Sequence, residues 1–212
     1  MIIYQIVNLN IPGSSLYRKD RNNKFKSKGG GVALYRNENL VSGHHEILPD
    51  TECEAVWAKI SVSKNSHLLV GVCYRSPSST TEENMQLTKV IETAANNCAL
   101  IFGDFNYPNI DWKNLDADKS SRYFLNLVTN SFLTQHVSSP TRGSNILDLV
   151  FTTEPGMVEE LQVRENLANC DHNILTWEVN CNAALCVNVN RPRYVFHKGN
   201  YDGFSLFLSG NP

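Results

Sequence analysis

The chain has 212 residues, 42% of them hydrophobic, which is enough for one domain with a sizeable core and too little for two full domains. Its formal net charge is −2, so no overall positive field attracts nucleic acid or anionic membranes, and any site for a polyanion must be local. No apolar stretch approaches the roughly 20 residues of a membrane-spanning helix. The opening MIIYQIVNLNIPG lacks the basic start and the cleavage pattern of a signal peptide.

The six cysteines form no CxxC pair, and several lie in apolar runs where a thiol behaves as a small buried hydrophobe. This usage indicates a reduced, intracellular chain, nuclear or cytoplasmic. Only Cys181 and Cys186 come close to metal-ligand spacing, which argues against structural zinc. The chain has no GxGxxG or Walker loop, so we expect no small-molecule cofactor.

The first half of the chain predicts three strands and one helix. The strands are expected at residues 31–36, 55–62 and 68–74, and strict alternation in the second predicts one buried face. Thr80 and Glu83 make a capping box, and apolar residues then recur at helical spacing up to Asn96-Asn97. This pattern predicts an amphipathic helix.

A short apolar run at residues 99–102 follows the helix and ends in Gly103-Asp104-Phe105-Asn106, which predicts a buried strand with polar groups at its carboxyl end. A second helix is expected at about residues 121–132. Further strands are expected at 146–152, 158–163 and 173–179. Only some strands alternate with helices, so a layered α+β sandwich is favoured over a parallel Rossmann sheet.

Three aspartates stand where buried strands begin or end, namely Asp104, Asp148 and Asp171. If their carboxylates converge to about 4 Å, each like-charged pair costs roughly 4 kcal/mol at an effective dielectric near 20, so a cation or an imidazolium must share the site. Oxygen ligands without thiolates favour Mg²⁺. His172, next to Asp171, would supply the imidazole.

Several segments carry a family resemblance. GDFN at 103–106, LDLVFT at 147–152 and the Asp171-His172 pair resemble three signatures of the endonuclease/exonuclease/phosphatase superfamily. More narrowly, the chain resembles the apurinic-type endonuclease domain of non-LTR retrotransposons over about residues 14 to 179. The segments that carry this likeness are, in order, YRKDR, KGGGVALY, VCYRSP, GDFNYPNIDW and SSPTRGSNILDLVF.

The resemblance implies a four-layer α/β/β/α sandwich of the DNase I-like type. It also implies Mg²⁺-dependent phosphodiester hydrolysis that nicks DNA and leaves a 3′-hydroxyl to prime reverse transcription. Residues 14–179 would form this domain after a divergent lead at 1–13. Residues 180–212 would be a linker, leading in the full-length ancestor to a reverse transcriptase.

The roles of four residues follow from the resemblance. Asp104 would deprotonate or orient the attacking water and contact the metal, and Asn106 would donate a hydrogen bond to a phosphoryl oxygen. Asp148 would accept from the ring of His172, fixing its tautomer and favouring an imidazolium that binds the scissile phosphate.

Three further residues complete the predicted site. Asp171 would reach the metal or orient the surroundings of His172, and Tyr74 and Arg142 would contact phosphate, although a strand-end tyrosine and a solvated loop arginine are the alternatives. The basic run from Arg18 to Lys28 would either lie along a DNA backbone or form a solvated hairpin.

The start of the chain departs from the superfamily pattern. An Asn and a metal-binding Glu normally precede the YRKDR segment, but residues 1–16 contain no Glu, and neither Asn8 nor Asn10 stands in a matching motif. We therefore expect an N-terminally truncated domain that lacks its first strands and binds metal less well. Truncation would also leave unpaired sheet edges.

Three functions remain open from the sequence. The first is an endonuclease, and the second is a catalytically inactive remnant of a retrotransposon, kept as a binding module or not functional. The third retains the fold but hydrolyses a phospholipid or an inositol phosphate. The retrotransposon-like PTRG and YPNIDW segments argue against the third.

Overall fold

The computed structural model describes residues 11–21, 31–43, 53–166 and 170–180, which form an α+β fold. Its two α-helices are α1 (Thr81–Ala94) and α2 (Arg122–Asn130), and a 3-10 turn, η1, spans Pro155–Met157. The strands are β1 (Ser14–Asp20), β2 (Gly31–Asn37), β3 (Ser42–Gly43), β4 (Ala55–Ser63), β5 (Ser66–Tyr74), β6 (Ala99–Asp104), β7 (Ile110–Asp111), β8 (Asp116–Ala117), β9 (Thr134–Gln135), β10 (Asp148–Thr152), β11 (Val158–Arg164) and β12 (Ile174–Val179). The predicted α+β class is confirmed.

The central sheet is mixed and has the strand order β3-β4-β5-β6-β10-β9. Strands β5 and β6 are parallel, and α1 forms the crossover between them, as parallel neighbours require. Every other pair in this sheet is antiparallel. This topology places the carboxyl ends of β5 and β6 at the same sheet edge as the start of β10.

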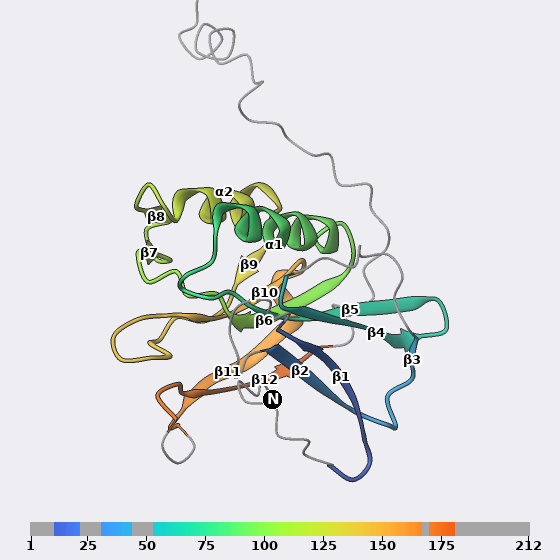
Figure 1. The fold of residues 1–212 in the computed structure, drawn as a ribbon. Coiled ribbons are helices and arrows are strands. Elements are labelled where there is room, and N and C mark those ends of the chain that lie inside the picture. The colour runs from blue at the N-terminus through green and yellow to red at the C-terminus, as the bar shows by residue number, and fades with distance from the viewer. Residues whose placement is uncertain (1–10, 22–30, 44–52, 167–169, 181–212) are drawn as a thin grey trace, which may run out of the picture.

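Both faces of the central sheet are covered (Figure 1). The helices α1 and α2 pack on one face, and the hairpins β1–β2 and β11–β12 cover the other. The helix-side core includes Leu87, Ile91, Ile101, Phe105, Phe124 and Phe151. The hairpin-side core includes Val32, Leu34, Val72, Phe102, Val150 and Met157. Within the described ranges the chain thus supplies three layers, α/β/β, of the expected sandwich.

Sequence patterning predicted the long elements well and the polar ones poorly. The capping box is present, because the hydroxyl of Thr80 accepts from the amide of Glu83 and the carboxylate of Glu83 accepts from the amide of Thr80. The strand β1 was not predicted, since it lies in the basic segment YRKDR. The prediction of one buried face for β4 is wrong at Trp57, whose ring packs toward the helix-side core and lies over Gly71.

Gly103 is the next-to-last residue of β6. Of the described glycines, it has the closest approach between a built Cβ and a neighbouring backbone atom. Its φ is +149°, and a Cβ at this position would lie 1.8 Å from the carbonyl oxygen of Cys73 on β5. Backbone cannot yield as a flexible side chain can, so we expect Gly103→Ala to destabilise the fold by about 3 kcal/mol or more. Urea unfolding measures this loss.

Gly156→Ala is the matched control, because a Cβ there has no heavy atom within 4 Å. We expect this variant to unfold within about 0.5 kcal/mol of the wild type. Equal stabilities for the two variants would contradict the close approach of β5 and β6.

Candidate active site

Two carboxylates face each other across the antiparallel pair β6–β10. Asp104 and Asp148 are register partners, and both are nearly inaccessible, with 2% and 5% of their surface exposed. Because side chains alternate along a strand, both share a face with Phe102 and Val150 of the hairpin-side core. The two acids are therefore positioned by the same alternation that buries their apolar neighbours.

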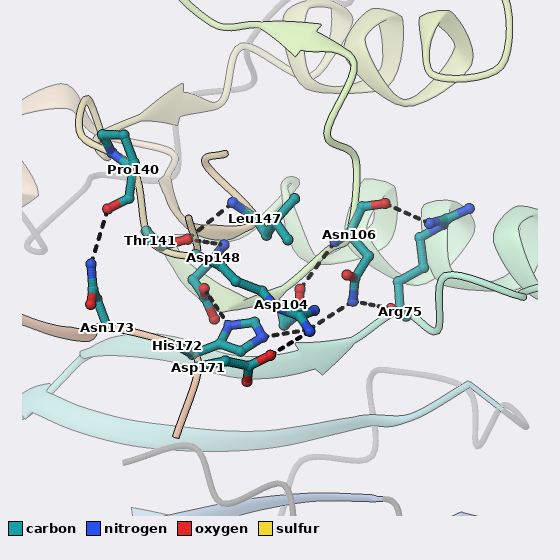
Figure 2. Close-up of polar contacts among 11 residues, drawn as sticks. Arg75, Asp104, Asn106, Pro140, Thr141, Leu147, Asp148, Asp171, His172 and Asn173 are labelled. Carbon is teal, nitrogen blue, oxygen red and sulfur yellow. Dashed lines mark hydrogen bonds and ion pairs between the residues drawn. The ribbon is translucent and has the colours of Figure 1, made fainter. Parts of the chain in front are cut away.

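His172 lies between these carboxylates, in the loop that precedes β12 (Figure 2). Its Nδ1 lies 2.8 Å from Oδ2 of Asp148, which is a hydrogen bond. Its Nε2 lies 4.0 Å from Oδ2 of Asp104, which is within ion-pair range but longer than a hydrogen bond. Of the three predicted acids, two therefore lie together with the imidazole, and their site lies between the central sheet and the second β layer.

Burial and mutual charge shift the pKa values of this cluster. Burial, reinforced by the charge of Asp148, raises the pKa of Asp104 to about 6, although His172 and Asn106 act in the opposite direction. The hydrogen bond to Asp148 raises the pKa of His172 above its usual value, against the effect of burial. The cluster therefore combines a carboxylate that titrates near neutral pH with an imidazole that favours its cationic form.

Asn106 holds the Asp104 carboxylate from the other side (Figure 2). Its backbone amide donates to Oδ1 of Asp104 at 3.2 Å, and its Nδ2 donates to Oδ2 at 2.7 Å. The same Nδ2 also donates to the carbonyl of Arg75 at 2.9 Å. Both hydrogens of this amide are thus engaged. The structure places Asn106 beside Asp104, and donation from Asn106 to a phosphoryl oxygen stays a prediction.

Thr141, which the sequence analysis did not predict as a site residue, connects the segment that carries Asp148 to the segment that carries His172. Its hydroxyl accepts from the amides of Leu147 and Asp148, both at 3.0 Å, and its carbonyl accepts from the amide of Asn173 at 2.8 Å. The side chain is fully buried. The sequence signal that could have identified Thr141 is its place in the PTRG segment, shortly before the LDLVFT motif.

Arg142 and Asp171 form an ion pair with each other on the surface. The Asp171 carboxylate is 63% exposed, and this ion pair lowers its pKa despite the opposing effect of its partial desolvation. Asp171 thus contacts the predicted phosphate-binding arginine, and its expected contact with a metal stays a prediction.

Tyr74 ends β5 opposite Asp104 in the parallel register, so it reaches the same edge of the sheet. The guanidinium of Arg21 lies 5.3 Å from the centre of its ring and also binds the carboxylate of Glu54. In the predicted basic run, Arg18 pairs with Asp20, whereas residues 22–30 lie outside the described residues. Contact of this run with DNA stays a prediction.

The oxygen donors of the cluster fit a divalent cation that shares its coordination shell with substrate. Among the residues that the structure describes, no group of three or more His, Cys, Asp or Glu side chains is arranged to hold a metal ion. Mg²⁺ commonly takes only one or two protein carboxylates and completes its shell with water and phosphate. Among the described residues, the Asp104 oxygens accept hydrogen bonds from Asn106 and lie within ion-pair range of His172, so Asp104 would be the main carboxylate ligand of such an ion.

Comparisons with known proteins identify the fold and the family separately. No curated protein matches the chain, and no described helix is long and apolar enough to cross a membrane. The solved endonuclease domain of TRAS1, a telomere-specific non-LTR retrotransposon, superposes with a TM-score of 0.66 at 16% identity, covering 85% of this chain and 84% of that one. This likeness confirms the predicted DNase I-like fold. The model of the endonuclease-reverse transcriptase family matches residues 68–176, just over half of the chain, and the protein therefore belongs to that family.

Proposed function

We propose that this chain is a Mg²⁺-dependent DNA endonuclease that nicks one strand and leaves a 3′-hydroxyl. The observation that carries the proposal is the cluster at the sheet edge, where His172 lies 2.8 Å from Asp148 and 4.0 Å from Asp104. A family of endonuclease-reverse transcriptases supplies the reaction class.

In this mechanism Asp104 takes a proton from the attacking water, a task that suits a carboxylate with a pKa of about 6. The water oxygen then forms a bond to phosphorus, and the bond from phosphorus to O3′ breaks. The leaving O3′ takes up a proton from solvent and becomes the 3′-hydroxyl. His172, held cationic by Asp148, binds a phosphoryl oxygen as negative charge develops there.

Other residues position the substrate. Tyr74 and Arg142 contact phosphates of the DNA backbone. Arg142 reaches the DNA from the loop before β10, where its side chain also pairs with Asp171. Asp104, and secondarily Asp171, would hold a Mg²⁺ ion, whose charge would offset that of the phosphate. The attraction for DNA is local, because the chain as a whole has a net charge of −2.

The proposed domain comprises residues 14–179, and it acts with a reverse transcriptase in the full-length ancestor. The lead at residues 1–13 and the linker at residues 180–212 flank this domain. Residues 1–10 and 181–212 of these two segments lie outside the described residues. The chain covers 84% of the TRAS1 endonuclease domain.

Conversion of supercoiled plasmid to the nicked circle tests the function. The purified chain is incubated with Mg²⁺, with Mg²⁺ and excess EDTA, and with a series of Mg²⁺ concentrations. We expect nicking that EDTA abolishes and that needs more Mg²⁺ than a nuclease with several carboxylate ligands, because Asp104 is the main protein ligand.

The alternative is a catalytically inactive remnant that survives as a binding module. A folded, monodisperse sample that leaves the plasmid supercoiled at every Mg²⁺ concentration would refute the nuclease and favour this alternative. Nicking that persists in EDTA would refute the metal dependence alone.

A further inference from the structure

The segment that follows Asp104 turns through a left-handed backbone conformation at Asn106. Asn106 has a φ of +49°, in the left-handed region that costs most residues free energy. Asn106 is also the residue whose amide groups orient Asp104. Whatever keeps Asn106 in this conformation therefore also fixes the Asp104 carboxylate.

Arg75 contacts Asn106 through both its main chain and its side chain (Figure 2). Its amide donates to the carbonyl of Asp104 at 2.8 Å, and its carbonyl accepts from Nδ2 of Asn106 at 2.9 Å. Its Nη1 donates to the carbonyl of Asn106, also at 2.9 Å. Three hydrogen bonds thus join Arg75 to the Asp104–Asn106 segment.

The guanidinium group of Arg75 is itself held in place. Its Nε donates to Oδ1 of Asn84 in α1 at 2.7 Å, and its Cζ lies 4.1 Å from the centre of the Tyr107 ring. A planar fork that stacks on an aromatic face while donating in two directions is a geometry that lysine cannot reproduce. Arg75 therefore connects α1 to the segment that orients Asp104.

The geometry points to Arg75 as a positioning residue that holds Asn106 in its left-handed conformation and thereby orients Asp104 for the proposed hydrolysis. Arg75 acts through the contacts of its guanidinium with Asn84, Asn106 and Tyr107, and attraction of DNA is not its role. The inference rests on the proposed function, because orientation of Asp104 is judged by the rate of nicking.

The test compares Arg75→Ala and Arg75→Lys with the wild type and with Arg164→Ala, which removes an exposed arginine side chain of β11 that donates to Gln162. We expect kcat for nicking to fall by about a hundredfold in both Arg75 variants, with KM unchanged, because displacement of a catalytic group by about 1 Å costs that much. Arg164→Ala should behave as the wild type.

Two measurements separate positioning from a loss of folding or of charge. Low-millimolar guanidinium should restore at least about a tenth of the lost rate to Arg75→Ala by occupying the vacated space, whereas the same concentration of ammonium should not. If Arg75→Ala does not fold, Asn84→Ala removes the Nε acceptor instead and should lower kcat in the same direction. A rise in KM that Arg75→Lys reverses would overturn the inference in favour of a DNA contact.

A readout independent of nicking is the side-chain amide resonance of Asn106 in nitrogen-15 NMR spectra. Both hydrogens are bonded in the wild type, so we expect slow exchange with solvent that becomes fast in Arg75→Ala. Unchanged exchange would refute the positioning role, whether or not the wild type nicks DNA. A wild type that does not nick, combined with altered exchange in the variant, would refute the proposed function only.

Discussion

Replacing His172 with alanine is expected to lower the rate of plasmid nicking by about 10²–10³-fold, the range that loss of one donor to developing transition-state charge costs. The side chain supplies the only imidazole between the two carboxylates in the described part of the chain. Its removal leaves Asp104 and Asp148 as register partners with no cationic partner between them. Initial nicking rates at saturating Mg²⁺ measure this effect.

His67→Ala provides the matched control for this substitution. His67 is an exposed histidine at the start of β5, where its Nδ1 contacts the hydroxyl of Ser61. We expect its nicking rate to equal that of the wild type. A His172→Ala rate within about tenfold of the wild type would show that the imidazole does not take part in the reaction.

Asp148→Asn is expected to move the pH profile of nicking to lower pH and to slow the reaction by about 10–100-fold near neutrality, as loss of an orienting carboxylate does. Activity should require ionised Asp104, so it rises with pH through the pKa of that group, which burial and Asp148 raise and a bound Mg²⁺ would lower. It should also require cationic His172, so it falls as the pH rises through the elevated pKa of the imidazole.

Asp148 raises both of these pKa values, so its neutralisation lowers both. The hydrogen bond to Asp148 is the largest cause of the shift at His172, and the charge of Asp148 is second only to burial at Asp104. Rates measured from acid to alkaline pH should therefore show both limbs displaced toward acid. If the maximal nicking rate falls but neither limb of the pH profile shifts, Asp148 affects only the geometry of the site and not these pKa values.

Fold class and family could be predicted from the sequence because they depend on local patterns. Alternation, helical spacing and apolar runs predicted nine of the long elements, and the Thr80–Glu83 box marked the start of α1. The two-residue strands β3, β7, β8 and β9, together with β1, were not predicted, because very short strands and basic strands carry no periodic apolar signal.

The candidate site divides in the same way. Asp104, Asp148 and His172 could be predicted, because a charged residue at the end of a buried apolar strand stands out against its neighbours. The engagement of both Asn106 donor hydrogens and the support from Arg75 could not, because they depend on contacts between segments some thirty residues apart.

By itself the sequence determined which residue types are available, which strands are buried and which motifs indicate the family. Only the tertiary structure decided which of the three acids lie next to one another. The antiparallel register of β6 with β10 brings Asp104 opposite Asp148, while the loop before β12 brings in His172 and leaves Asp171 with Arg142 at the surface. The physical reason is that strand register and loop docking are set by packing of the whole core, whereas burial and turns are already encoded in local pattern.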